Sequence, residues 1–144
     1  MNQSVPSHIS SLRYYTQIYI EKRLKEAGIE EISSSHGSVI YALLNHEQMR
    51  MKDLAKVIQR DKSTLTVLMK KLLRFGYVEM MNSSEDKRVK YVRLTEKGKG
   101  IRDVFLKVSE DLNHQLWKNI SSKQGDVFIS VLHQMINNIR EERE

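Results

Sequence analysis

Cysteine is absent from this chain of 144 residues. Its absence excludes disulfide frameworks, thiolate metal sites, cysteine nucleophiles and thiol-based redox sensing. Proline occurs once and glycine six times. Because both residues interrupt helices, their scarcity predicts long helices rather than a loop-rich β fold. We therefore expect a mainly α-helical protein.

Long apolar segments are also missing. The longest uninterrupted apolar run, Val39–Leu44, has six residues, whereas a membrane-spanning helix needs roughly 20. Charged side chains interrupt the first thirty residues, which therefore lack the apolar stretch of a secretory signal. We expect no membrane partner, a cytoplasmic location, and a single domain over residues 1–144.

Sequence signatures of catalysis are missing too. The chain has no glycine-rich phosphate loop, no His-Glu-x-x-His pair and no nucleophile elbow. Its titratable residues are scattered over the predicted helix surfaces. The sequence therefore predicts a protein that is not an enzyme and has no cofactor.

Positive charge is concentrated in one third of the chain. The formal net charge is +6, and residues 52–99 contain thirteen Lys and Arg against six Asp and Glu. Such concentration suits a polyanion such as nucleic acid, because neutralised phosphates release condensed counterions. A basic surface that is simply solvated explains the composition equally well, so composition leaves both interpretations open.

Apolar residues recur at helical spacing over most of the sequence. A glycine, Gly28, follows the first such segment, and Ser121 with Gln124 has the spacing of a capping box before the last one. Residues 140–144 are highly charged and are expected to fray. Helices are predicted over residues 9–27, 33–45, 51–58, 61–75, 95–120 and 121–139.

The predicted helix after Asp61 has the clearest pattern. Asp61 is placed to accept hydrogen bonds from the N–H groups of Ser63 and Thr64, and Gly76 is placed to end the helix. One arc of this helix is apolar, and it contains Leu65, Leu68, Met69, Leu72 and Leu73. The opposite arc is polar and cationic, with Ser63, Val67, Lys70 and Arg74 at its centre and Thr64, Thr66 and Lys71 on its flanks.

The helices over 51–58 and 61–75, joined by a tight turn, match what a helix-turn-helix requires. In that motif the exposed face of the second helix enters the major groove, where hydroxyl and cationic groups meet base edges and phosphates. An ordinary helical hairpin with a solvated polar face is the alternative.

Two short β-strands are predicted over residues 77–80 and 89–94, because both segments are rich in β-branched and aromatic side chains. Between them lies a polar hairpin tip with Lys87 and Arg88. These cations are placed to reach an adjacent minor groove, and Asp86 is expected to brace Arg88 by a charge-assisted hydrogen bond. A solvent-exposed turn with scattered charges is the alternative.

Five segments, all in register, resemble the winged helix-turn-helix signature of the MarR family of transcriptional regulators. The Asp-x-Arg wing followed by Leu-Thr-x-x-Gly is the most specific part, and the length and helix order of the chain are similar to those of the family. The segments are Leu54-Ala55, Asp61–Thr66, Lys71-Leu72 to Gly76-Tyr77-Val78, Asp86–Arg88 and Leu94–Gly98.

The resemblance implies a mainly α fold with a small two-stranded β wing, an α+β arrangement. It implies a winged helix-turn-helix DNA-binding lobe over residues 33–100 and dimerisation helices in 1–27 and 101–144. It further implies a homodimeric regulator, most often a repressor, on a pseudo-palindromic operator in double-stranded DNA. One departure concerns the helix over 51–58, where family members often have a Ser or Thr cap but this chain has Arg50, which is placed to contact phosphate.

The resemblance also implies which residues contact DNA. Ser63, Thr64, Thr66, Val67 and Lys70 match recognition-helix positions that face DNA, and Arg88 matches the wing arginine in the minor groove, with Asp86 as its brace. With the neighbouring cations, the predicted DNA-binding set is Lys62, Ser63, Thr64, Thr66, Val67, Lys70, Lys71, Arg74, Lys87 and Arg88.

The ends of the chain support a dimer independently of the resemblance. Met135, Ile136 and Ile139 continue an apolar stripe nearly to the C-terminus, and the first helix has its own apolar face. A chain of this size has little core left to cover both, whereas a second copy would cover them. Packing of the two ends within one chain is the alternative.

Members of the family are commonly released from DNA by small aromatic acids, metals or cysteine oxidation, and the last is excluded here. A candidate pocket for a small aromatic ligand, with Arg13 as carboxylate partner, would use Tyr14, Tyr15, Tyr19, His36, Tyr41 and Trp117, although plain core or dimer packing explains these residues too. A metal-responsive regulator would need clustered ligands, and His36, His46, His114, Glu47 and Glu110 lack a recognisable spacing, so no metal site is predicted. A protein-interaction adaptor of the same fold, without operator recognition, is the alternative from another functional class.

Overall fold

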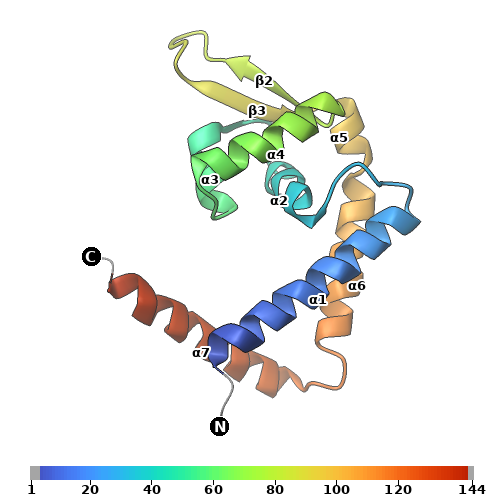
Figure 1. Ribbon diagram of the computed structural model, residues 1–144, viewed down its shortest axis with the longest axis vertical. Helices are drawn as coiled ribbons and strands as arrows, with labels where there is room; N and C mark the ends of the chain where they lie inside the picture. Colours follow the sequence, from blue (N-terminus) through green and yellow to red (C-terminus); the bar gives the residue numbers. More distant parts are fainter. Residues whose placement is uncertain (1–3, 143–144) are drawn as a thin grey trace. The chain divides into compact units, whose positions relative to one another are not determined.

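The computed structural model describes residues 4–142 and is mainly α-helical with one small sheet, which confirms the predicted fold class (Figure 1). Its contacts divide the chain into two compact units, with the boundary between Ser109 and Glu110. The elements, in chain order, are α1 (Val5–Glu26), α2 (Ser34–Leu43), β1 (Met49–Arg50), α3 (Met51–Val57), α4 (Lys62–Arg74), β2 (Val78–Asn82), β3 (Lys90–Leu94), α5 (Glu96–Gly100), α6 (Arg102–Leu116) and α7 (Ser122–Glu141).

The first helix begins earlier than the sequence predicts. α1 starts at Val5 instead of residue 9, because the Ser4 side chain accepts a hydrogen bond from the N–H of Ser7 and Pro6 occupies the first turn. It ends as predicted at Gly28, whose φ of 79° is left-handed. The sequence prediction missed this first turn, although Val5 lies four residues before Ile9 and Ser4 with Pro6 was a local signal for an earlier start.

The helix that carries the predicted DNA-binding face has both predicted ends. At its start the Asp61 carboxylate accepts a hydrogen bond of 2.7 Å from the N–H of Thr64, and at its end Gly76 has a φ of 75°. Its apolar arc is buried at Leu65, Leu68, Met69 and Leu72. Leu73 is a correction, because it lies at the edge of the arc and is 38% exposed.

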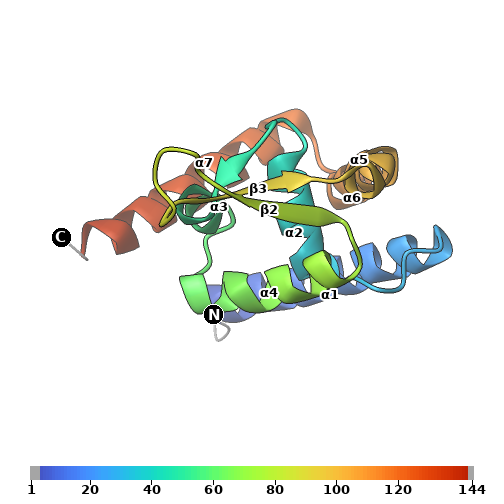
Figure 2. The same cartoon turned by 90° about the horizontal axis from the view of Figure 1, so that it is seen from above.

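The sheet has three strands, not the predicted two. β2 and β3 form the antiparallel hairpin, from the pair Val78 and Leu94 to the pair Asn82 and Lys90 (Figure 2). β1 lies on the other side of β3, in the order β1-β3-β2. A strand of two residues has no detectable alternation, so only its pairing in the fold reveals it.

The predicted helix over 95–120 is two helices. Thr95 caps α5 as predicted, but the chain leaves helical geometry at Ile101, where ψ is 2°, and resumes as α6. Gly98 and Gly100, which have low helix propensity, come just before this break. α6 also ends at Leu116 rather than 120, and Asn119 adopts a left-handed φ of 62°.

The buried core lies within the first unit. Gly37 lets α2 pack tightly, since a Cβ there would lie 2.6 Å from a ring carbon of Phe105. The largest fully buried side chains, which come from α1, α2, α3, α4 and β3, are Leu24, Val39, Ile40, Leu43, Leu54, Leu65, Leu72 and Val92.

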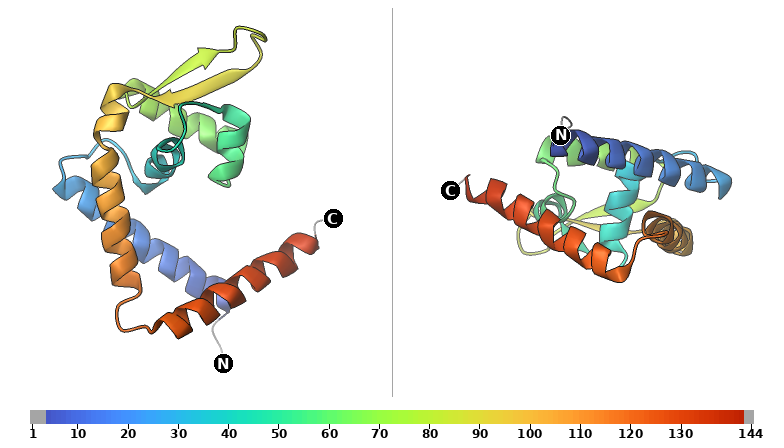
Figure 3. Two further views of the ribbon diagram at one scale, coloured as in Figure 1. Left: turned by 180° about the vertical axis from the view of Figure 1, so that it is seen from behind. Right: turned by 90° about the horizontal axis from the view of Figure 1, so that it is seen from below.

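The second unit has little core of its own. α7 is one uninterrupted helix (Figure 3, red), and its predicted capping box is present, with Ser121 and Gln124 each bonding the backbone N–H of the other. Trp117 and Phe128 meet edge to face at 6.3 Å. Other apolar side chains of α7 are about half exposed, for example Ile136 at 47%. None of the helices described over residues 4–142 is both long and apolar enough to cross a membrane.

Candidate nucleic-acid interface

The polar face of α4 is presented outward. The predicted contact residues on this helix are exposed, including the apolar Val67 at 65%. The Thr66 hydroxyl donates to the Lys62 carbonyl at 2.8 Å, so its oxygen lone pairs remain available as acceptors. Burial of the opposite arc therefore turns hydroxyl, methyl and ammonium groups toward any ligand that approaches this face.

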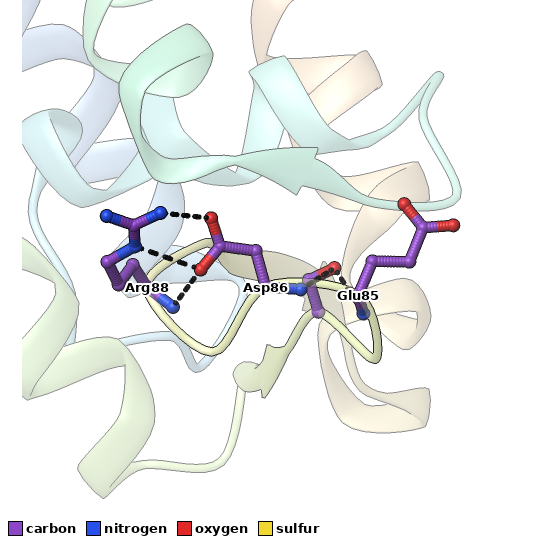
Figure 4. A network of polar contacts seen from close by, with 4 residues as sticks. Glu85, Asp86 and Arg88 are labelled. Atoms are coloured by element: carbon purple, nitrogen blue, oxygen red, sulfur yellow. Dashed lines mark hydrogen bonds and ion pairs between the residues drawn. The ribbon is translucent and has the colours of Figure 1, made fainter.

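On the wing, the Asp86 carboxylate orients the Arg88 guanidinium. Arg88 donates from Nε at 3.1 Å and from Nη2 at 3.2 Å to the two oxygens of Asp86, and its backbone N–H donates to the same carboxylate at 3.0 Å (Figure 4). The Arg88 guanidinium lowers the pKa of Asp86 below its usual value. The Arg88 side chain nevertheless stays 91% exposed. It is thus oriented and still accessible.

A serine shapes the tip of the wing. The Ser83 hydroxyl accepts hydrogen bonds from the backbone N–H groups of Glu85 at 3.2 Å and Asp86 at 3.4 Å. This local turn replaces strand pairing at the tip and places Asp86 where it can hold Arg88.

A hollow of about 720 Å³ lies between α3, α4 and the wing, and we call it the basic groove. Leu65, Met69 and Met80 contribute apolar side chains to its lining. Seven cationic residues also line it, namely Arg50, Lys52, Lys56, Lys62, Lys70, Arg88 and Lys90.

Three of these cations, Lys52, Lys56 and Lys90, were missed by the sequence analysis, which had named Arg50 only as a phosphate contact. Lys52 and Lys56 are four residues apart and so share one face of α3. That spacing was an available signal. Lys90 had none, because its place in the groove depends on the strand pairing.

Arg50 is held at the start of the groove by an aromatic partner. Its guanidinium lies 5.9 Å from the centre of the Tyr91 ring, on the neighbouring strand. A hydrogen bond with Tyr91 is the main cause of the raised pKa of Arg50. Arg50 thus occupies the N-cap position of α3 without a capping side-chain hydrogen bond, and its cation lies beside the sheet.

Three of the predicted cations, Lys71, Arg74 and Lys87, do not line the basic groove. Lys71 lines a different hollow of about 430 Å³ with Glu21, Lys25 and Ser33. The Arg74 guanidinium lies 5.7 Å from the centre of the Phe75 ring. Lys87 is exposed on the wing. DNA contact by these three residues stays a prediction.

Known proteins resemble this chain in sequence and in structure. Residues 32–98 match the family described as a winged helix DNA-binding domain. The HTH-type transcriptional regulator SarZ of Staphylococcus haemolyticus is 34% identical over 100 residues, covering 69% of this chain and 67% of SarZ. A MarR transcriptional regulator from Methanosarcina mazei Go1 has a TM-score of 0.79 at 26% identity, covering 94% of this chain and 96% of the other. The chain belongs to the MarR family of winged-helix transcriptional regulators.

Further relatives agree with membership of the MarR family. The regulator YdgJ of Bacillus subtilis is 30% identical over 108 residues, covering 75% of this chain and 66% of YdgJ. A MepR–DNA complex of S. aureus has a TM-score of 0.87 and covers 95% of this chain and 99% of MepR, and at 19% identity it shows the shared fold. The sequence matches span about two thirds of the relatives' lengths. SarZ, YdgJ and the Methanosarcina mazei protein are named as transcriptional regulators.

The predicted effector residues of this MarR-family chain are divided between the two units, and those in the first unit are dispersed. Tyr14 and Tyr15 contact each other at 5.3 Å but are 60% and 68% exposed. Arg13 lines a hollow of about 170 Å³ whose described lining includes no aromatic residue. Tyr41 is 54% exposed, and Trp117 belongs to the second unit. A ligand pocket built from these residues therefore stays a prediction.

His36, one of the predicted effector residues, has a local structural role at the start of α2. The backbone N–H of Ser33 donates to Nδ1 of His36 at 3.1 Å, which caps α2 and identifies Nδ1 as an acceptor. Burial, followed by the nearby Lys71 charge, lowers the pKa of His36. Among residues 4–142, no three His, Asp or Glu side chains gather in a way that could hold a metal ion.

Proposed function

We propose that this regulator binds double-stranded DNA in a sequence-specific way, with α4 in the major groove and Arg88 in the adjacent minor groove. The observation that carries the proposal is the basic groove. If α4 and the wing enter neighbouring grooves, the sugar-phosphate strand that separates those grooves must pass between them. Cations from α4, Lys62 and Lys70, and from the wing, Arg88 and Lys90, line that passage.

The division of labour follows from the chemistry of each face. Ser63 and Val67, exposed at the centre of the α4 face, are suited to base edges and thymine methyl groups, which differ between base pairs in the major groove. The lysines neutralise phosphates and position the protein without selecting a sequence. Arg88 suits a narrow A·T-rich minor groove, where the potential is most negative.

We also propose that the protein acts as a homodimer on a pseudo-palindromic operator and represses transcription by occupying it. Support comes from apolar faces that the single chain leaves uncovered. On α1, Ile9 and Leu12 are each 47% exposed, and on α7, Phe128 and Ile139 are 50% and 65% exposed. Monomers rarely expose contiguous apolar patches of this kind, so a second copy is the fitting cover.

In vitro selection of bound DNA tests the proposal. The expected product is a pseudo-palindrome whose half-sites lie about one helical turn apart. With about eight phosphate contacts per dimer, log K should fall against log[salt] with a slope near −7. Failure to enrich a sequence, together with a slope near zero, would instead indicate an adaptor of the same fold.

Release by a small aromatic acid is the part of the proposal that rests on the sequence alone. Titration of the operator complex with benzoate-type acids should dissociate it, and Arg13→Ala should weaken that response if Arg13 binds the carboxylate. A complex that no such acid dissociates would remove this part and leave operator binding intact.

A further inference from the structure

Two segments outside the proposed DNA-binding surface, residues 75–77 and 95–97, contact each other at the C-terminal end of α4. The Thr95 hydroxyl donates to the Gly76 carbonyl, and the Thr95 N–H donates to the Tyr77 carbonyl at 3.1 Å. The Lys97 ammonium donates to the Phe75 carbonyl at 2.7 Å. Segments 75–77 and 95–97, about twenty residues apart in sequence, thus form one junction.

Lys97 is suited to this position electrostatically. The last carbonyls of a helix have no partner within it and carry the negative end of the helix dipole. Phe75 is the C-terminal cap of α4. A charged donor on its carbonyl therefore satisfies a group that would otherwise depend on water.

Tyr77 ties the junction to the rest of the lobe. Its side chain is 2% exposed, and the Lys97 ammonium lies 4.4 Å from the centre of its ring. Its hydroxyl donates to the Glu31 carboxylate at 3.2 Å, across the loop between α1 and α2. Burial is the main cause of the raised pKa of Tyr77, so the hydroxyl stays protonated and able to donate.

Gly98 makes the close approach possible. A Cβ at this position would lie 2.1 Å from the Tyr77 carbonyl oxygen, which is a backbone atom and cannot move aside cheaply. The Gly98 N–H donates to the Thr95 hydroxyl at 3.1 Å. The junction therefore accounts for the spacing of Thr95, Lys97 and Gly98.

We infer that Lys97 is a positioning residue for DNA recognition: by holding the Phe75 carbonyl and the Tyr77 ring, it fixes the direction of α4 relative to α5 and the wing. Lys97 does not line the basic groove. Because α4 carries the base-contacting side chains, a tilt about its C-terminal end displaces Ser63, near its other end, the most. The inference rests on the proposed function for its effect on DNA.

The decisive variant is Lys97→Met, which keeps a side chain of similar length but removes the ammonium group that donates to the Phe75 carbonyl. Operator affinity should fall about tenfold, the effect of losing one charge-assisted hydrogen bond. Affinity for non-specific DNA should change less than twofold, and the salt slope should stay unchanged. By comparison, Lys70→Gln should reduce the magnitude of the salt slope by about 0.9 per protomer, because Lys70 is assigned to a phosphate contact. Lys97→Arg keeps a donor and should restore most of the operator affinity.

A second readout uses the free protein. In Lys97→Met the amide of Thr95, which bonds the Tyr77 carbonyl, should exchange with solvent several-fold faster than in the wild type. Lys99→Met is the matched control, because Lys99 lies on the same short helix and pairs only with the exposed Glu96, at 3.3 Å, among the described residues. It should change neither exchange nor DNA affinity.

Three results would overturn the inference. A salt slope reduced in magnitude by about 0.9 per protomer in Lys97→Met would make Lys97 a phosphate contact. A lowered Tm with unchanged operator affinity would make it merely structural. Unchanged exchange at Thr95 would mean that Lys97 does not hold the junction, and this result can be obtained even if the wild-type protein selects no operator and the proposed function fails.

Discussion

Helices α4 and α7 have the same kind of amphipathic sequence but different surroundings. In α4 the apolar arc packs inside the lobe, where Leu72 is 0% exposed. In α7 the equivalent stripe is open, with Val127 56% and Ile136 47% exposed. The comparison shows that apolar periodicity predicts that a helix will be covered but not what covers it. For α4 the cover is the chain itself, and for α7 we propose a second chain.

The largest effect is expected in α4, whose apolar arc is covered by the chain itself. Leu72→Ala removes a fully buried side chain from the core and should lower the free energy of unfolding by about 2 to 5 kcal/mol. Urea denaturation followed by circular dichroism measures the change. Ile139→Ala, at a position that is 65% exposed, is the matched truncation in α7. Equal losses in both variants at a protein concentration where the chain is monomeric would erase the difference between the two helices.

The next prediction tests whether the exposed apolar stripe of α7 is a dimer interface. Phe128→Glu places a charge in the proposed interface of α7, where Phe128 is 50% exposed, and should weaken dimerisation by at least about 2 kcal/mol through an unpaired buried charge. Sedimentation velocity over a concentration series measures the shift. Lys118→Glu, an exposed change in the same unit, is the control. A dimer of unchanged strength would disprove the assignment of this face.

Replacements on α4 test base recognition on its outward face. Ser63→Ala and Val67→Ala should each change the preference at a central position of the half-site by roughly 1 to 3 kcal/mol. Selection of bound DNA with each variant measures that preference. Lys70→Gln should instead weaken binding to all sequences alike. Uniform weakening by all three variants would remove the claim that this face distinguishes bases.

A smaller change is expected from the wing. Arg88→Ala removes the guanidinium held by Asp86 and should lower affinity by about 1 kcal/mol, most on operators with A·T-rich flanks. Competition binding with matched A·T-rich and G·C-rich flanks shows the difference. Loss of affinity without any flank preference would place Arg88 on a phosphate instead of in the minor groove.

The smallest effect is a pH dependence inside the lobe. His36 has a lowered pKa in the fold, so between its ordinary value of 6.5 and that lower value the unfolded chain binds a proton that the folded chain does not. Stability should therefore fall as the pH drops below 6.5. His36→Gln should flatten this part of the profile, measured as Tm against pH. An unchanged profile would mean that other groups cause it.

Much of the lobe was predictable because its signals are local. Asp61 and Gly76 delimit α4 through capping and left-handed geometry, both set by side chains within a few residues. The Asp86–Arg88 pair occupies three consecutive positions, so its hydrogen bonds need no distant partner. The strand β1 was missed because it depends on pairing with β3. The break at Ile101 was also missed, although Gly98 and Gly100 just before it have low helix propensity.

The surface proposed for DNA was only partly predictable. Lys62, Lys70 and Arg88 were identified from one helix face and one hairpin tip. Three further cations join them only because α3, with Lys52 and Lys56, and β3, with Lys90, line the same groove. Lys71 shows the reverse case: it shares the polar side of α4 in sequence, yet it lines a different hollow together with Glu21 and Lys25.

By itself, the sequence determined where most helices begin and end, which arc of α4 turns inward, and that positive charge gathers in the middle third. Caps, apolar periods and charge counts are properties of neighbours along the chain. Only the tertiary structure decided which cations share a groove and that Lys97 reaches the end of α4. Those relations join residues far apart in sequence, and the close packing of helices and strands alone brings them within contact.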